Sequence, residues 1–340
     1  TSDYSSRNIT RTDRDQPGYD VNGNVSYTRS LSKRSRLSFE YRINYTDNSV
    51  ERNTFVLTKE NVFPDERNPR QSTEYDYAYL THRIGSTYQY YFKKTKIAGT
   101  LHYQHAAFSS DYAFPYARKT ETSFDNLTYS VVANINVNRN NTLKFNASGR
   151  TSNPRATDLQ DIVNTTNRQN VFAGNPGLDP VYTHRLSGQY IRANPAKGRT
   201  FTVSAEATAS PNTITDSLVI DSPHFVIVID GDGTELGEGN QFVRPVNLPG
   251  YWNLRTTLSY GFPVRWLRSN LNVRAGVTTG RIPSVINGTR NRLNGDSYDA
   301  GLTLGSNISE SVDFKIGYTG CYNVSRNSSQ IRTVDNVYVC

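Results

Sequence analysis

A two-residue alternation of apolar and polar side chains, which restarts many times along the sequence, most constrains what this chain can fold into. The alternation is clearest at residues 37–45, 127–137 and 252–262. Successive side chains of a β-strand point to opposite faces, so each segment predicts a strand with one apolar and one polar face. About thirteen such segments, each of roughly ten residues and joined by turns, are typical of a transmembrane antiparallel β-barrel.

The composition agrees with strands that need only one apolar face. The 340 residues have a mean hydropathy of -0.64 and are 35% hydrophobic, too little for the core of a soluble all-β protein of this length. A membrane barrel needs apolar residues only where strands face lipid, and its aromatic girdles would use many of the 23 tyrosines. No run approaches about 18 apolar residues, so no transmembrane helix is predicted. Because a soluble sheet alternates too, a β-solenoid or sandwich stays open as an alternative.

The connections between the predicted strands alternate in length. Short turns are expected near residues 32–35, 93–96, 138–142, 194–199 and 263–269, and long stretches at 1–16, 109–123, 152–180, 210–250 and 280–294. Outer-membrane barrels sort connections in this way, with short periplasmic turns and longer extracellular loops. The strand count is odd, whereas bacterial single-chain barrels have even counts. We therefore predict that residues 1–340 form one incomplete, all-β barrel domain of about 13–14 strands in the bacterial outer membrane, with lipid as a partner.

Charged side chains on the polar faces are the candidate functional residues. If the apolar faces contact lipid, the polar faces line the lumen and can shape an electrostatic path for a polar or anionic solute. The lumen-facing candidates are Arg42, Lys144, Arg185, Glu206, Arg255, Arg274 and Lys315. The plainer alternative is that they only contact water or a plug.

The remaining motifs favour neither an enzyme nor a metalloprotein. The acidic tip at residues 230–235 fails the EF-hand pattern, because Glu235 and Gln241 stand where Gly and Glu are needed. A solvated turn is the expectation there, and a calcium ion the alternative. The five histidines lack metal-binding spacing, and no G-x-S-x-G elbow is present. We therefore predict no catalytic residue, no metal and no cofactor.

Charge and cysteine content are less informative. The net charge is +8, but the basic residues are scattered, so no nucleic-acid partner is predicted. The 2 cysteines, Cys321 and Cys340, are expected to be unpaired, although an oxidising compartment would permit a disulfide. The chain begins without methionine, and we interpret it as a mature or trimmed chain.

Four short stretches carry a resemblance to a known family. They are residues 152–160, the Gly-Asn-Pro-Gly-Leu-Asp-Pro run at 174–180, and residues 314–318 and 322–323. Together with the loop layout they resemble the TonB-dependent receptor-like outer-membrane β-barrel family that is common in Bacteroidota. The run at 174–180 also has a plain local explanation, in which Gly174 and Pro176 make a turn and Pro180 stiffens the start of the next strand.

The resemblance implies a larger barrel of about 22 strands, with a plug in its lumen. It also implies TonB-dependent uptake of a ligand that the extracellular loops capture, here residues 152–180 and 210–250. No segment of this chain is recognisable as a plug, so either a plug lies upstream of Thr1 or this relative does without one. The alternative is a structural or docking barrel for surface or secretion machinery, without active transport. Its partner would be a surface lipoprotein or another protein.

Overall fold

The structure is a computed structural model of the 340-residue chain. It describes residues 10–57, 62–69, 71–160, 163–164, 169–220, 226–229, 232–235, 240–309, 312–328 and 330–339. These residues form one 18-stranded sheet and a separate 2-stranded sheet. No helix within these ranges has the length and hydropathy that crossing a membrane requires.

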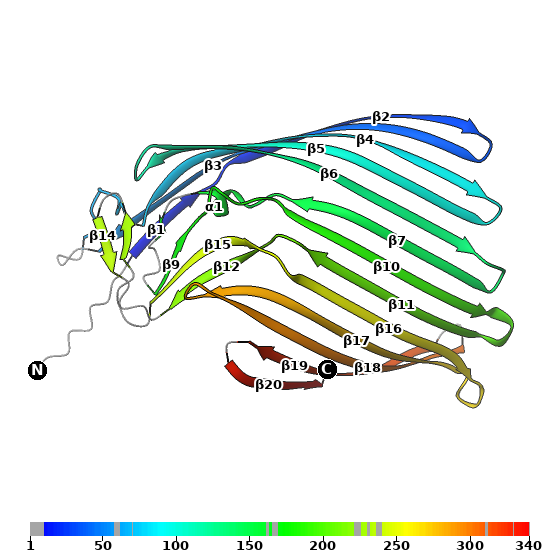
Figure 1. Ribbon diagram of the computed structural model, residues 1–340. Coiled ribbons are helices and arrows are strands. Elements are labelled where there is room, and N and C mark those ends of the chain that lie inside the picture. The colour runs from blue at the N-terminus through cyan, green and yellow to red at the C-terminus, as the bar shows by residue number, and fades with distance from the viewer. Residues whose placement is uncertain are drawn as a thin grey trace, which may run out of the picture.

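The large sheet is an antiparallel wall in which each long strand pairs with the next (Figure 1). In spatial order the wall contains β2 (Gly18–Ser32), β3 (Ser35–Val56), β4 (Thr73–Phe92), β5 (Thr95–Phe114), β6 (Arg118–Asn136), β7 (Asn141–Ser152), β10 (Val181–Asn194), β11 (Arg199–Ser210), β16 (Tyr251–Val264), β17 (Ser269–Ile286), β18 (Thr289–Ser309), β19 (Val312–Asn327) and β20 (Gln330–Val339). These thirteen strands confirm the predicted all-β wall and its strand number.

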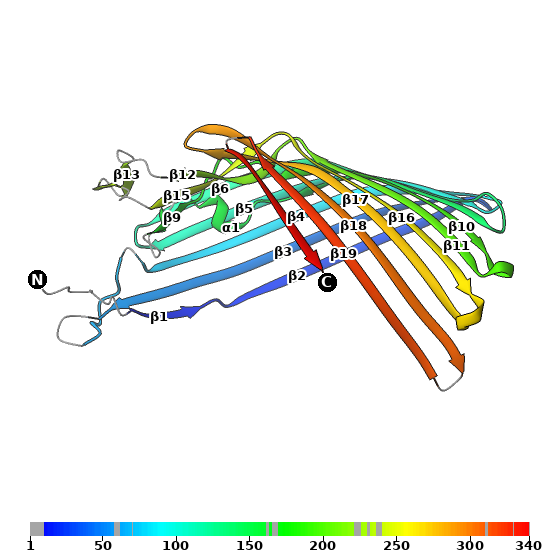
Figure 2. The same cartoon turned by 90° about the horizontal axis from the view of Figure 1, so that it is seen from below.

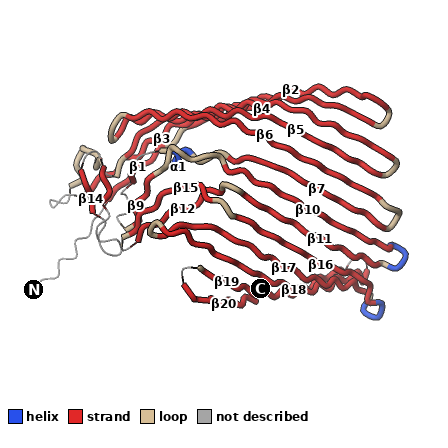
Figure 3. The backbone as a smooth tube through the Cα atoms, in the orientation of Figure 1, coloured by secondary structure: helices blue, strands red, loops and turns tan. Residues whose placement is uncertain are grey.

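Shorter elements gather at one end of the wall. They are β1 (Thr10–Asp15), α1 (Ala156–Leu159), β8 (Val163–Asn164), β9 (Asn170–Ala173), β12 (Thr213–Ile220), β13 (Val226–Ile229), β14 (Asp232–Glu235) and β15 (Gln241–Leu248). The opposite end has tight turns, two of which contain the 3-10 helices η1 (Pro195–Lys197) and η2 (Arg265–Leu267). The tube view in Figure 3 shows these helical turns at the ends of their hairpins. We call the two ends the loop side and the turn side.

The wall curves but does not close (Figure 2). Within the described residues, β2 pairs only with β3, and β20 pairs only with β19. Because an open edge leaves backbone groups without partners, a spanning sheet must be completed into a barrel. The wall is therefore a partial barrel, as predicted.

The two faces of the wall separate apolar from polar side chains. The outer face exposes apolar residues along every strand from β2 to β7, for example Val25, which is 71% exposed, and Leu127, which is 55% exposed. On β16 the outward aromatic residues Trp252 and Tyr260 lie about 27 Å apart along the strand, at roughly 3.4 Å per residue. That spacing suits an apolar band about 25 Å tall between two aromatic girdles. The outer face is therefore the lipid face.

Three expectations about loops are wrong, because strands continue where loops are predicted. Residues 10–15 form β1, which pairs with the end of β3. Strands β5 and β6 leave only residues 115–117 between them, and β17 and β18 are joined at residues 287–288. These segments lie beyond the lipid band, where the outer face need not be apolar. The alternation of apolar and polar side chains is therefore weaker in these segments, although the hydrogen bonds between neighbouring strands continue.

Candidate functional site

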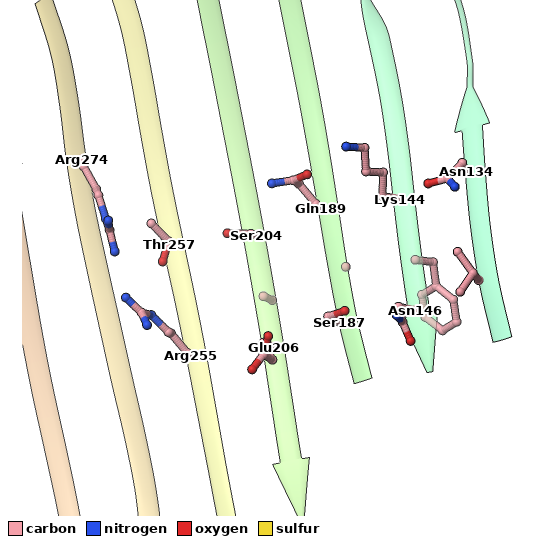
Figure 4. A pocket seen from close by; sticks show the side chains of 14 residues that line it. Asn134, Lys144, Asn146, Ser187, Gln189, Ser204, Glu206, Arg255, Thr257 and Arg274 are labelled. Carbon is pink, nitrogen blue, oxygen red and sulfur yellow. The ribbon is translucent and has the colours of Figure 1, made fainter. Parts of the chain in front are cut away.

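A hollow on the inner face of the wall is the first candidate site. It has a volume of about 590 Å³, and its lining comes from β6, β7, β10, β11, β16 and β17. Figure 4 shows the labelled side chains side by side across these strands. The polar lining residues are Asn134, Lys144, Asn146, Ser187, Gln189, Ser204, Glu206, Arg255, Thr257 and Arg274. Four of the seven predicted residues, Lys144, Glu206, Arg255 and Arg274, therefore share one hollow.

Strand register explains why these charges meet. Glu206 lies directly opposite Arg255 on the neighbouring strand, and cross-strand partners project to the same face. Glu206 also forms an ion pair with Arg185, a fifth predicted residue, which lies just outside the hollow. Arg274 approaches Asp299 with an N···O distance of 3.5 Å. Three cations and one carboxylate line the hollow, so it favours an anionic group over a cationic one.

The other two predicted residues lie elsewhere on the inner face. Arg42 on β3 forms an ion pair with Glu40, whose second oxygen lies 3.6 Å from Nε2 of His102. Arg83 lies 3.2 Å from Nδ1 of His102, which extends this polar network to β4 and β5. Lys315 on β19 is exposed and lies opposite Gly305, close to the turn side. The seven predicted residues therefore belong to separate places on one wall.

The described residues within 153–180, namely 153–160, 163–164 and 169–180, form the second candidate site, because they fold back over the inner face at the loop side. Ala156 and Leu159 of α1 pack with Leu178 against Phe108 and Phe124. Phe124 shares the inner face with Asn134, since both occupy the same phase of β6. Figure 2 shows α1 within the curve of the wall. This segment, which we call the mouth loop, therefore narrows the opening.

One hydrogen bond joins the mouth loop to the wall, and an ion pair stabilises the loop internally. The hydroxyl of Tyr79 donates to the carbonyl of Pro154 at 2.6 Å. Arg155 donates two hydrogen bonds of 2.9 Å to the carboxylate of Asp158, whose side chain is only 5% exposed. These bonds raise the pKa of Arg155. The paired charge lets a carboxylate lie buried next to an apolar cluster.

The Gly-Asn-Pro run packs the second half of the mouth loop against the first. Its turn runs from Asn175 to Leu178, with the Leu178 amide donating to the Asn175 carbonyl at 3.2 Å. Pro176 is therefore in the turn as predicted, but Gly174 precedes it. A Cβ on Gly174 would collide with the carbonyl of Gln160, so glycine is needed there for close approach. The motif therefore brings the two arms of the mouth loop into close contact as well as turning the chain.

The stretch at 210–250 also contains structure. Strands β12 and β15 form an antiparallel hairpin, and β15 pairs in parallel with β9 of the mouth loop. Beyond them β13 and β14 form a separate hairpin. Asp230 and Gly231 of the acidic tip, together with Cys340 and His224, lie outside the described residues.

The sequence interpretation missed the apolar cluster of the mouth. Its signal was present, because Ala106, Phe108 and Phe124 are apolar residues in the polar phase of their strands. An apolar residue on a lumen-facing position needs something to cover it. These residues border the stretch 109–123, where the sequence predicts a loop, so they were not recognised as strand positions with a buried face.

The open antiparallel wall, with its apolar exterior, polar interior and loops on one side, defines an outer-membrane β-barrel. The chain belongs to the outer membrane protein beta-barrel family, whose model matches residues 1–339. The predicted outer-membrane β-barrel and its location in the bacterial outer membrane are confirmed.

Two solved structures share the fold. The copper transporter OprC matches with a TM-score of 0.53 and 9% identity, over 94% of this chain and 51% of that one. The Serratia marcescens hemophore receptor HasR, solved as a double mutant in complex with its hemophore HasA and heme, matches with a TM-score of 0.50 and 10% identity, over 98% of this chain and 58% of that one. This chain thus spans little more than half the length of either. No curated protein matches the sequence.

Proposed function

We propose that this chain is the wall of an outer-membrane receptor that takes up a polar or anionic ligand captured on the loop side. The observation that carries the proposal is the mouth loop, which is packed onto the inner face above a cation-rich lumen. A loop that served only as an external cap would have no need of an apolar anchor on the lumen wall. The arrangement supports controlled passage between the loop side and the turn side.

The mechanism would consist of binding and gating, without covalent chemistry. The mouth loop and the β12–β15 hairpin would contact the ligand first, since they lie at the opening. Lys144, Arg255 and Arg274 would then favour an anionic solute along the wall. Gating would come from a plug outside this chain, energised by the TonB system. The ligand could be an oligosaccharide, a peptide or a metal chelate.

The test uses the full-length protein in its own membrane. Cells that carry the wild-type gene are incubated with a defined mixture of acidic and neutral oligosaccharides and peptides, and depletion of each compound is measured by mass spectrometry. The double variant K144Q/R255Q and a strain without TonB serve as comparisons. We expect depletion of an acidic compound that both changes reduce. Equal depletion in all strains would refute uptake, and a full-length sequence without a plug would argue against energised gating.

A second candidate is a docking barrel, which one observation favours. Among the residues that the structure describes, β13 and β14 pair only with each other, so their hairpin offers a surface separate from the large sheet. The HasR structure contains a bound hemophore, which illustrates a protein ligand on a barrel of this fold. Stable co-purification of one protein, lost when residues 226–235 are deleted, together with unchanged solute uptake, would favour docking over transport.

A further inference from the structure

A small cavity under the mouth loop contains two arginines that face each other. Arg14 on β1 and Arg52 on β3 are direct cross-strand partners, so their side chains lie on the same face of the sheet. Like charges at such a pair are destabilising unless something of opposite charge lies between them. Among the described residues that line the cavity there is no carboxylate. The two guanidinium groups therefore lack an acidic partner within the cavity.

Two buried donors without partners belong to residues that line the same cavity. Gln160 is 6% exposed, and its Nε2 has no hydrogen-bond partner among the described protein atoms. The same is true of the buried Nε of Arg52. Both residues line the cavity. Since an unmade hydrogen bond to a buried donor costs about 1–3 kcal/mol, two such donors in one cavity indicate a missing acceptor.

The rest of the lining suits an oxygen-rich acceptor. The cavity has a volume of about 170 Å³, and Thr73, Thr157 and the stacked Tyr75–Tyr112 pair contribute to its lining. At roughly 10–15 Å³ per water molecule by the same measure, the space admits a group of several heavy atoms. Burial lowers the pKa of Arg52, and the nearby charge of Arg14 lowers it further. A bound anion would relieve both effects.

We propose that this cavity binds an oxyanion, a carboxylate or phosphate group of the captured ligand, between Arg14, Arg52 and Gln160. Arg14 is exposed and stands at the entrance, whereas Arg52 and Gln160 lie deeper. The anion would accept hydrogen bonds from two guanidinium groups and one amide, which is the donor set that such groups prefer. The site joins three separate segments, β1, β3 and the mouth loop, and would therefore couple ligand binding to loop position.

The test is calorimetric titration of the full-length protein in detergent with sodium phosphate and, separately, with sodium citrate. We expect at least one anion to bind, and the variant R52Q to bind it about tenfold or more weakly. The matched control is R36Q, which removes an arginine from the same face of β3 at the turn side. Binding of phosphate alone identifies a phosphate site, and binding of citrate alone identifies a carboxylate site. Failure of both anions to bind, or equal weakening by R36Q, overturns the proposal.

A second variant tests the site in case R52Q does not fold. The exposed residue Arg14 can be replaced in R14Q, which should leave the anion-free protein at least as thermally stable as the wild type, because a like-charge pair is removed. Addition of the anion should raise the melting temperature of the wild type more than that of R14Q, and equal shifts would contradict the site. The ligand assignment rests on the proposed function, but binding in detergent does not need transport. Anion binding without uptake would refute only the transport proposal, and uptake without anion binding would refute only this site.

Discussion

Replacing Leu159 with alanine should release the mouth loop from the wall. Leu159 is 0% exposed and belongs to the cluster formed with Phe108 and Phe124. Truncation of a fully buried leucine costs about 2–5 kcal/mol of stability. We expect a cost in the lower half of this range, because the cluster lies near water and its neighbours can partly fill the cavity. A loss of about 2–3 kcal/mol raises the population of the undocked loop roughly 30- to 150-fold, at 1.4 kcal/mol per factor of ten.

Hydrogen exchange of the full-length protein in detergent measures this change directly. The amide of Asn175 donates to the carbonyl of Asp158 at 2.5 Å, which joins the two arms of the mouth loop. Leu159 and Leu178 hold these arms together where they pack on Phe108 and Phe124, so exchange of this amide reports on loss of that packing. Its exchange should accelerate by the same 30- to 150-fold, whereas the amides of β16 should be unaffected. The control is Leu254→Ala, which truncates a leucine that faces lipid and is 40% exposed. If Asn175 in Leu159→Ala exchanged within about twofold of the wild-type rate, the apolar anchor would be refuted.

Three further outcomes follow from the structure. Gly174→Ala should lower the melting temperature and speed exchange in the mouth loop, because the added methyl group collides with Gln160. Gly99→Ala should change neither, since among the described residues no atom beyond its chain neighbours lies within 4 Å of the new carbon. Leu258→Arg, on the lipid face, should destabilise the barrel in vesicles by about 2–4 kcal/mol, measured by urea unfolding, whereas Ser204→Arg on the lumen wall should cost much less. Glu206→Gln removes the carboxylate from the hollow, so the protein should bind an anionic dye more tightly in fluorescence titrations, and weaker binding would contradict the charge assignment.

The lipid-facing part of the wall follows from the sequence because a bilayer enforces the pattern. Leu254 and Leu258 alternate with Arg255 and Thr257, since one face must be apolar and the other meets water. Beyond the bilayer neither face has that requirement, and the ends of β5 and β6 carry Asp111, Lys119 and Glu121 on the outside. Backbone pairing there does not depend on side-chain contrast, so periodicity could not reveal those strand ends.

The candidate sites were less predictable, because register and loop docking determine them. Lys144 and Arg274 are far apart in the sequence, and they share a hollow only because the connections bring β7 and β17 to the same part of the wall. Arg42 and Lys315 have the same local pattern but lie on distant strands. The cavity lined by Arg14 and Arg52 could not be predicted, because Arg14 lies on β1, in a segment where the sequence indicated a loop.

The long strands have a consequence for the thermodynamics of capture. Strand β3 has 22 residues, about twice the 9–11 that a tilted transmembrane strand needs. The surplus rises above the bilayer as hydrogen-bonded sheet, so its conformational entropy is already lost before any solute arrives. A surface preorganised in this way loses little flexibility on association, and affinity then depends mainly on the contacts themselves.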